Sequence, residues 1–515
     1  MLEDSIQKQA ENFLKISKQF RLGSLPTETP HPRTINLSGD SKNNLINAIE
    51  TIKAIDVDVF LTLKKSLPQI EQLHKDIKKV LENDGRIFLC GCGATGRLSL
   101  ALETIWRHKH KKSEVKDRII SFMAGGDVAL IHSVEKFEDF PEYGERQLRE
   151  LGFCENDLLI SCTEGGETPF VIGATELAVK LSKYSPYFLY CNPDDILIQT
   201  TERSKRVIEN HKIKKINLTV GPMALTGSTR MQATTILMYA VGLALWFFDK
   251  DFTLVEKELK SLIHFIQKYD FSFLEKFIIE ESSIYKKNEF ILYETNSALG
   301  ISILTDTTER SPTFSLFPFE NQNDGEKFPS LSYLYFPHSE SSEVAWSDLL
   351  GRNPRTFHWP EVTDVTNYQR ILGFDFSHSL LNKRKVYTKS SNHLFQIYLN
   401  QTTNKLIFHL NKIEHSIDVS ELNFLSIHLL LKILLNSHST LVMGRLDRYQ
   451  SNLMTWVRAS NYKLIDRAVR YVTILLKQKG KDVSYEELVK TCYELKDSIP
   501  KDQSLVLTMV DKYSN

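Results

Sequence analysis

Short apolar segments of strand length alternate with segments of helical periodicity from residue 86 to residue 248. Strand–helix–strand units of this length form parallel sheets covered by helices, because a parallel connection needs a crossover of a dozen or more residues. The alternation therefore predicts an α/β domain. Strands are expected at Arg86–Cys90, Arg118–Met123, Asp157–Cys162, Tyr187–Cys191 and Asn217–Val220, and helices at residues 98–109, 169–182 and 228–248.

A second alternation begins near residue 290, which suggests that the domain is duplicated. Polar-patterned helices follow in residues 440–515, with Gly480 as a stop signal. We therefore expect two α/β domains with a helical C-terminal cap. In the second domain, strands are expected at Phe290–Glu294, Ser332–Phe336 and Ile371–Phe376, a hairpin at His393–Asn400 and Lys405–Leu410, and helices at residues 299–308 and 419–435.

The N-terminal segment has a pattern of its own. Residues 1–23 carry apolar side chains at helical spacing, which predicts a short amphipathic helix. Residues 24–38 contain three prolines and are expected to form an extended arm. The first residues carry acidic side chains and no apolar core, so they do not have the pattern of a signal peptide.

Composition excludes several classes of protein. The 515 residues contain 64 Lys+Arg and 64 Asp+Glu, so there is no basic excess that would indicate a nucleic-acid partner. The six cysteines are scattered, which favours free thiols over a disulfide framework or a zinc site. The longest uncharged run, residues 231–248, is expected to be a buried core helix rather than a membrane span. We expect a cytoplasmic protein without membrane contact, metal or cofactor.

A glycine-rich loop, GCGATG at Gly91–Gly96, follows the first strand and opens a helix. Backbone amides in such a loop bind an anion, aided by the helix N-terminus. A dinucleotide site would need an acidic residue about 20 residues further on, and the second strand ends too late for that. The hydroxyl of Thr95 favours a phosphate monoester. From the loop alone, a structural turn and a phosphate site are equally good interpretations.

Six segments together resemble one family: TETPHPRT, GCGATGRLS, AGGDVALIHSVEKFED, SCTEGGETPFVIGA, GPMALTGSTRMQA and SNLMTWVRASNYKL. They are similar to the sugar isomerase (SIS) domains of N-acetylmuramic acid 6-phosphate etherases and of the related glucokinase regulatory protein. The resemblance implies two SIS-type parallel-sheet sandwiches that form an internal pseudo-dimer. The expected divisions are an N-terminal helix and arm (1–55), a first SIS domain (56–250), a second (251–438) and a helical cap (439–515).

The resemblance implies a sugar-phosphate site in the first SIS domain. Ser228 and Thr229 are expected either to contact the ligand or to cap the following helix. Lys463 matches a lysine that reaches the sugar phosphate in the regulatory protein, the alternative being an exposed helix lysine. Glu167 adds negative charge, and two family lysines are replaced by Gln232 and Met238. The implied binding residues are Gly93, Ala94, Thr95, Gly96, Thr163, Glu164, Gly165, Ser228, Thr229 and Lys463.

The same resemblance assigns two carboxylates. Glu135 occupies the position of the base that removes a proton from the sugar, and Glu309, in TDTTERSPTF, matches the family's acid. A pseudo-dimer would place both at one composite site. The alternative for each is a solvated helix acid. The corresponding first-half residue is Ile105, and Glu103 lies about 200° away around the helix, so it should point elsewhere.

In the second domain the glycine loop is replaced by Thr295–Gly300, in which Thr295 and Ser297 would crowd a phosphate. We therefore expect one site per chain.

Three functions fit this pattern. The first is a regulator similar to the glucokinase regulatory protein, which senses a hexose or amino-sugar 6-phosphate and binds a hexokinase- or glucokinase-type partner. The second is an N-acetylmuramic acid 6-phosphate etherase that releases D-lactate with Glu135 and Glu309. The third, a sugar-phosphate isomerase or deaminase, lacks an evident basic residue for ring opening. The carboxylates alone do not separate the first two.

Overall fold

The first strand–helix alternation forms a five-stranded parallel sheet in the computed structural model, which describes residues 2–134, 137–500 and 502–514. Its order is β2-β1-β3-β4-β5, with Ile87 of β1 opposite Ile119 of β2 and Leu158 of β3. Strands β1 and β3 are buried along their whole length, as expected for a sheet covered on both faces. The strands are β1 (Ile87–Gly91), β2 (Ile119–Met123), β3 (Leu158–Cys162), β4 (Tyr187–Tyr190) and β5 (Lys214–Asn217).

The prediction for the last of these strands was wrong by three residues, because β5 ends at Asn217 where the predicted strand begins. As an edge strand, β5 tolerates polar side chains that do not read as an apolar run. Lys214, for example, forms an ion pair with Asp76 of a neighbouring helix.

The second alternation forms a mixed five-stranded sheet of order β10-β9-β8-β6-β7. Strands β6, β7 and β8 are parallel, whereas β8, β9 and β10 form an antiparallel meander. The predicted hairpin is confirmed, and its continuation into β10 was not predicted. The strands are β6 (Phe290–Glu294), β7 (Ser332–Tyr335), β8 (Asn392–Asn400), β9 (Lys405–Leu410) and β10 (Ile413–Asp418).

The strand predicted at Ile371–Phe376 is wrong. This segment begins in the last turn of helix α16 (Tyr368–Leu372) and continues as an irregular, buried chain. Its backbone bonds to neighbours outside a sheet: Phe376 accepts from the amide of Phe336 and Phe374 from the indole of Trp346. An apolar run can be buried by such packing as well as in a strand.

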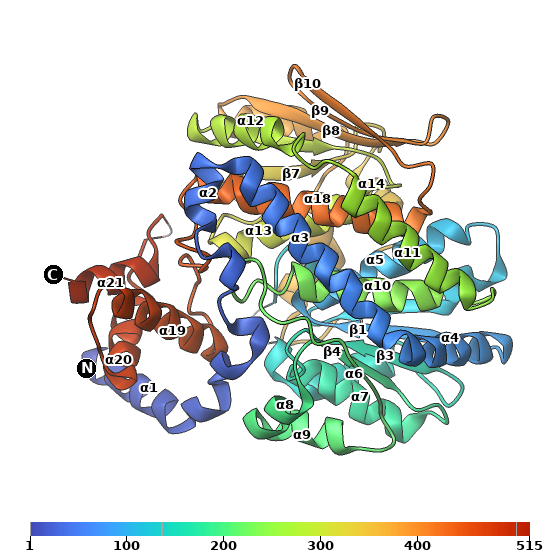
Figure 1. The fold of residues 1–515 in the computed structure, drawn as a ribbon, viewed down its shortest axis with the longest axis horizontal. Helices are drawn as coiled ribbons and strands as arrows, with labels where there is room; N and C mark the ends of the chain where they lie inside the picture. The colour runs from blue at the N-terminus through green and yellow to red at the C-terminus, as the bar shows by residue number, and fades with distance from the viewer. Residues whose placement is uncertain (1, 135–136, 501, 515) are drawn as a thin grey trace.

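Helices from both halves fill the space between the two sheets (Figure 1). They are α5 (Gly93–Lys109), α10 (Gln232–Trp246), α13 (Gly300–Phe314) and α18 (Phe424–Arg445). Among the described residues, only α18 has the length and apolar composition of a membrane span, and 94% of that window is buried inside the protein. Helix α10 covers most of the predicted uncharged run and is also buried, as expected.

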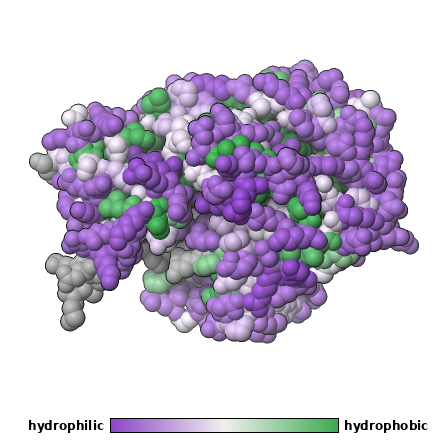
Figure 2. All heavy atoms as spheres, turned by 90° about the horizontal axis from the view of Figure 1, so that it is seen from below, coloured by the Kyte–Doolittle hydropathy of each residue, from purple (hydrophilic) through white to green (hydrophobic). Residues whose placement is uncertain are grey.

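Most of the remaining helices surround the sheets, whereas α2 and α3 pack along the helices that lie between them and α11 packs on α3 (Figure 1). Those of the first half and the connecting segment are α2 (Leu37–Asn43), α3 (Leu45–Leu63), α4 (Leu67–Glu82), α6 (Pro141–Glu150), α7 (Pro169–Leu181), α8 (Asp194–Thr200), α9 (Glu202–Glu209) and α11 (Thr253–Lys268). Those of the second half are α12 (Leu274–Lys286), α14 (Ser342–Leu350), α15 (Thr363–Thr366) and α17 (Leu380–Thr388). Outside them, the surface in Figure 2 is mostly hydrophilic, with hydrophobic side chains in small separate groups.

The two termini come together in a lobe beside the sheets (Figure 1). This lobe contains α1 (Leu2–Ile16), α19 (Tyr462–Gln478), α20 (Tyr485–Leu495) and α21 (Leu505–Ser514). Gly480, with φ of 72°, ends α19 as predicted. The arm at residues 24–38 is not regular helix, but it is a chain of short 3-10 turns rather than an extended segment. The predicted α/β fold with a helical C-terminal region is confirmed, whereas the domain boundaries stay predictions.

Buried ion pairs join the two halves near β2, the edge of the first sheet. Arg352 contacts Glu103 at 3.0 Å and Asp127 at 2.6 Å, and Arg355 contacts Glu103 at 2.8 Å. Beyond them, Trp359 stacks on Phe137 within the core of the first half. Glu103 thus points away from the glycine loop, as its place on the helix predicts.

Candidate functional site

The glycine loop is shaped by Thr95, whose side chain is fully buried. The Thr95 hydroxyl accepts from the Cys92 amide at 3.0 Å and donates to the Cys92 carbonyl at 2.9 Å. The predicted ligand hydroxyl is therefore occupied in capping α5. The loop opens instead at Gly93, where φ is 54° and an added Cβ would meet no atom within 4 Å. The amides of the first helical turn lie beside this opening.

The flanking glycines have packing roles. An added Cβ at Gly91 would lie 2.3 Å from the Thr95 carbonyl carbon, and one at Gly96 would lie 2.5 Å from Cβ of Met123. Glycine at both positions allows the loop to turn tightly and α5 to approach β2. Of the three loop glycines, only Gly93 leaves room for a ligand.

The loop after β3 carries a buried acid. Thr163 is buried, and its hydroxyl lies 3.1 Å from that of Thr168. The Gly165 carbonyl accepts from Asn192, which also bonds to Thr27 of the arm. Glu164 is 8% exposed, and burial raises its pKa to about 7. Near neutral pH, Glu164 is therefore divided between its charged and neutral forms.

The segment before α10 leaves one hydroxyl without a partner. Helix α10 begins at Gln232, and its N-cap residue Met231 makes no side-chain capping bond. Ser228 is 4% exposed, and its hydroxyl has no hydrogen-bond partner within the part of the chain that is described. The capping interpretation of Ser228 was therefore wrong. Thr229 is half-buried and contributes its carbonyl to Thr234.

Lys463 lies in the first turn of α19, and its Nζ is 3.1 Å from Glu167 Oε1. Burial alone would raise the pKa of Glu167, but the positive charges of Lys463 and Arg203 hold it at about 2. Lys463 is thus a partly buried, paired lysine rather than an exposed one. The same helix packs on the loop of Ser228, because Tyr471 donates to the Thr226 carbonyl at 2.8 Å.

Further acids surround Lys463. Glu138 accepts from the Cys92 thiol at 3.3 Å and from Asn461 at 3.2 Å, so it connects the glycine loop to α19. Burial, with Glu138 and Glu167 close by, raises the pKa of Asp139 to about 6. An incoming phosphate would therefore have to replace a carboxylate at Lys463.

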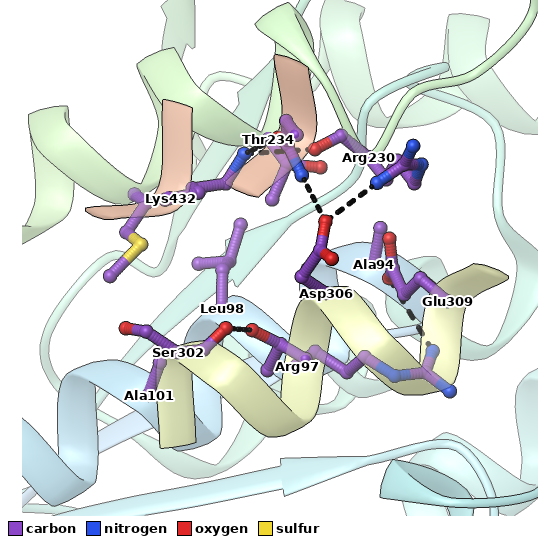
Figure 3. A pocket seen from close by; sticks show the side chains of 13 residues that line it. Ala94, Arg97, Leu98, Ala101, Arg230, Thr234, Ser302, Asp306, Glu309 and Lys432 are labelled. Atoms are coloured by element: carbon purple, nitrogen blue, oxygen red, sulfur yellow. Dashed lines mark hydrogen bonds and ion pairs between the residues drawn. The ribbon is translucent and has the colours of Figure 1, made fainter. Parts of the chain in front are cut away.

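A small cavity lies between the two halves; we call it the inter-domain cavity (Figure 3). Its volume is about 30 Å³. Ala94 reaches it from the glycine loop and Glu309 from α13, so the structure brings together two residues predicted to share a site. The lining residues are Ala94, Arg97, Leu98, Ala101, Arg230, Thr234, Met238, Ser302, Thr305, Asp306, Glu309, Lys432 and Asn436.

Ion pairs cross the inter-domain cavity. Arg97 Nη1 lies 3.5 Å from Glu309 Oε1, and Arg230 Nη1 lies 3.0 Å from Asp306 Oδ1 (Figure 3). Burial raises the pKa of Glu309 despite the neighbouring arginines. A buried carboxyl with a raised pKa can donate a proton as well as accept a hydrogen bond.

Lys432, from α18 of the second half, supports the loop of the first half. Its ammonium donates to the Arg230 carbonyl at 2.8 Å, to Thr235 at 2.8 Å and to Asn436 at 2.9 Å. Burial lowers its pKa to about 8. Lys432 and Met238 both line the cavity. Met238 of the first half stands at a position where the resemblance leads us to expect a lysine.

Sequence reasoning did not select Arg97, Arg230 or Lys432. Arg97 and Arg230 lie inside the quoted segments GCGATGRLS and GPMALTGSTRMQA, each directly after a residue selected for the site, and this adjacency was the available signal. Lys432 stands alone in an apolar run, so only the tertiary structure reveals its partners. The predicted base, Glu135, lies outside the described residues.

The corresponding loop of the second half is closed. Thr295 donates from its hydroxyl to the Ile397 carbonyl at 2.6 Å, and Asn296 accepts from the Ala298 amide at 3.0 Å. In sequence, Thr295 stands at the position of Gly91 and Ser297 at that of Gly93, so side chains replace both glycines. For metals, the described ranges contain no group of three or more His, Cys, Asp or Glu that could hold an ion.

Sequence comparisons show which known proteins this chain is similar to. Residues 69–179 match the family model of the glucokinase regulatory protein N-terminal SIS domain. The N-acetylmuramic acid 6-phosphate etherase of Actinobacillus pleuropneumoniae serotype 7 (strain AP76) is 31% identical over 42% of this chain and 65% of its own length. That of Bacillus subtilis (strain 168) is 29% identical over 43% and 67%. The chain thus spans about two thirds of the length of these relatives.

Two solved structures share low similarity with this chain. A Clostridium difficile 630 protein described as a phosphosugar isomerase has a TM-score of 0.44 at 11% identity, over 79% of this chain and 96% of its own. The C-terminal domain of glucosamine-fructose-6-phosphate aminotransferase from Francisella tularensis has a TM-score of 0.37 at 10% identity, over 78% and 96%. The family match is more specific: residues 69–179 match the glucokinase regulatory protein N-terminal SIS domain, in a chain distantly similar to N-acetylmuramic acid 6-phosphate etherases.

Proposed function

We propose that this chain binds a hexose or amino-sugar 6-phosphate at one site formed by both halves, and that it acts as a sensor like the glucokinase regulatory protein. One observation carries the proposal: Ala94 of the glycine loop and Glu309 of the second half line the same cavity. A ligand that touched both residues would sense the arrangement of the two halves, because each half supplies one wall.

The phosphate would bind at the opening beside Gly93. The amides of the first turn of α5 offer donors there, and the helix N-terminus favours negative charge. Leaving a buried hydroxyl such as that of Ser228 unpaired costs about 1–3 kcal/mol, which a ligand oxygen would recover. Lys463 would leave its ion pair with Glu167 and form one with the phosphate instead.

We also propose a hexokinase- or glucokinase-type protein as the partner and the cytoplasm as the location. Both rest on the family resemblance. Pull-down of a purified glucokinase by this chain, with and without fructose 6-phosphate, would test the partner. If glucokinase binds neither with nor without the sugar phosphate, the proposed partner is refuted.

Isothermal titration with fructose 6-phosphate, and with fructose as the phosphate-free control, tests the proposed site. Gly93→Ala places a methyl group at the opening and should abolish binding. Gly480→Ala is the matched control, because Gly480 also has positive φ (72°) and open space but ends a helix of the cap. Equal loss of binding in both variants, or unchanged binding in Gly93→Ala, would refute the site.

The second candidate is the etherase, and the buried Glu309 favours it. A carboxyl with a raised pKa is suited to protonate a departing ether oxygen. Release of D-lactate from N-acetylmuramic acid 6-phosphate would establish this activity, and Glu309→Gln and Glu135→Gln should each abolish it. Binding without lactate release would leave the sensor as the function.

A further inference from the structure

The arm carries the motif TETPHPRT (Thr27–Thr34), which supplies no residue to the proposed site. The motif forms short 3-10 turns between the terminal lobe and α2. Thr27, Glu28 and Thr34 are buried although their side chains are polar. Buried polar side chains in native proteins have hydrogen-bond partners. The partners of this motif therefore show which parts of the chain it holds.

Thr27 connects the arm to the loop after β3. The side-chain amide of Asn192 donates to the Thr27 hydroxyl at 3.0 Å and to the Gly165 carbonyl at 3.2 Å. The side-chain oxygen of Asn192 accepts from the Thr27 amide at 3.2 Å. Asn192 is fully buried, so water does not compete for these bonds. One asparagine thus joins the arm to Gly165, a residue implied to bind the phosphate.

Glu28 connects the arm to α19. Its Oε1 lies 2.5 Å from Nη2 of Arg467, and its Oε2 lies 3.0 Å from Nη2 of Arg470. Burial alone would raise the pKa of Glu28, but the two arginines hold it at about 2, so the carboxylate is ionised at neutral pH. Arg467 lies one turn after Lys463 on the same face of α19. The arm therefore holds the part of α19 that carries Lys463.

The end of the motif connects to the loop of Ser228. The side-chain amide of Asn452 donates to the His31 carbonyl at 3.0 Å and to the Thr34 hydroxyl at 2.9 Å. The backbone carbonyl of Asn452 accepts from the Thr226 amide at 2.8 Å. Thr226 stands two residues before Ser228, so a second buried asparagine joins the arm to this loop.

We propose that the TETPHPRT motif positions the phosphate site, because it holds the segments of Gly165, Lys463 and Ser228 in one arrangement. These three residues come from separate parts of the chain, and the motif is bonded to all three parts. Its own polar side chains are occupied by these bonds, so the motif positions the ligand contacts and does not itself touch the ligand. This inference rests on the proposed sugar-phosphate site and assigns the residues that align it.

Glu28→Gln tests the connection to Lys463, because it keeps the size of the side chain and removes the charge that Arg467 and Arg470 share. Isothermal titration of the full chain should show about tenfold weaker binding of fructose 6-phosphate, since a displaced ligand contact is costly. In a Lys463→Met background, Glu28→Gln should weaken binding by less than about twofold, because it acts through that lysine. The same factor in both backgrounds would overturn the positioning role and leave Glu28 a purely structural residue.

Thr27→Val is the second variant, because it removes the hydroxyl that Asn192 reaches and leaves no buried charge without a partner. It should weaken binding about threefold. Glu494→Gln, which breaks an exposed ion pair with Lys512 in the same lobe, is the control and should leave binding unchanged. Melting temperatures identify the variants that fold. Unchanged binding in either folded arm variant would overturn the inference, and Thr27→Val decides alone if Glu28→Gln does not fold.

The two proposals fail in distinguishable ways. If the native chain binds fructose 6-phosphate, Gly93→Ala abolishes binding and the arm variants bind as tightly as the native chain, only the role of the arm is refuted. If the native chain does not bind fructose 6-phosphate, the proposed function is refuted and the role of the arm with it.

Discussion

The two halves arrange their first three strands alike and differ at the loop that follows the first strand. The order β2-β1-β3 in one half is repeated as β7-β6-β8 in the other. In the first half this loop opens at Gly93, whereas in the second Thr295 bonds to the Ile397 carbonyl of β8. The duplicated frame thus places a helix after the first strand of each half, and the two halves differ in the residues of the loop before that helix.

The second half has a different part in the site. Its helix α13 begins after the closed loop and carries Glu309 to the cavity beside Ala94 of the first half. Its helix α18 carries Lys432 to the carbonyl of Arg230. The halves are therefore complementary: the first carries the loop proposed to bind the phosphate, and both supply charged side chains to the cavity.

The largest expected effect comes from removing the buried carboxylate that connects the two halves. Glu103→Gln leaves Arg107, Arg352 and Arg355 without their shared carboxylate, and should lower the free energy of unfolding by about 3–5 kcal/mol. Denaturant unfolding measures this. Glu361→Gln, which breaks the exposed pair with Arg146 between the same halves, is the control and should cost less than about 1 kcal/mol. Similar costs for both variants would contradict the buried connection.

Exchanging loop residues tests the difference between the two loops. Gly91→Ala brings a methyl group to 2.3 Å from the Thr95 backbone and should destabilise the chain by about 1–3 kcal/mol. Thr295→Ser in the second half keeps a hydroxyl toward Ile397 and should cost less than about 1 kcal/mol. Thermal unfolding compares them. A larger loss of stability in Thr295→Ser than in Gly91→Ala would contradict the tighter packing of the loop in the first half.

The acid of the β3 loop gives the first half its own pH dependence. Burial raises the pKa of Glu164 from 4.5 to about 7, so folding favours its neutral form. The stabilisation that comes from its neutral form is fully present below pH 4.5 and is lost as pH rises through 7, so the free energy of unfolding falls by about 3 kcal/mol. Glu164→Gln should flatten the stability curve across this window. A variant with the same slope as the native chain would exclude Glu164 as its source.

A smaller effect is expected at Lys463, which is proposed to bind the phosphate. Glu167 is ionised throughout the neutral range and occupies Lys463, so its carboxylate competes with a phosphate. Glu167→Gln should tighten binding of fructose 6-phosphate about threefold to tenfold in isothermal titration. Glu176→Gln, which breaks an ion pair on the outer face of α7, is the control and should leave binding unchanged. Weaker binding in Glu167→Gln would show that this carboxylate holds Lys463 in place for the ligand.

The sequence predicted the parts of the fold that depend on local pattern. The apolar runs that became β1, β3 and β6 are buried on both faces, so their composition identifies them. The segment at Ile371–Phe376 has the same composition but is buried by contacts with Phe336 and Trp346, which no local pattern encodes. The prediction of polar edge strands such as β5 fails for the opposite reason, because they belong to a sheet but have no apolar run.

The candidate site was predictable where a motif carries it. Gly93 and Ala94 stand in a recognisable loop, and Glu309 in a recognisable segment. The bonds from Thr95 to Cys92 were not predicted, because a hydroxyl in a glycine loop suits a ligand as well as a cap. The predicted contact of Thr95 with a ligand stays a prediction. Lys432 could not be found, since its acceptors in the first half, the Arg230 carbonyl and the Thr235 hydroxyl, lie some 200 residues earlier in the chain.

The stoichiometry of fructose 6-phosphate binding, measured by isothermal titration of the native chain and of Gly93→Ala, tests the central claim most directly. One open loop and one closed loop predict one ligand per chain in the native protein and none in the variant. Two ligands per chain, or one ligand that survives Gly93→Ala, would contradict the account.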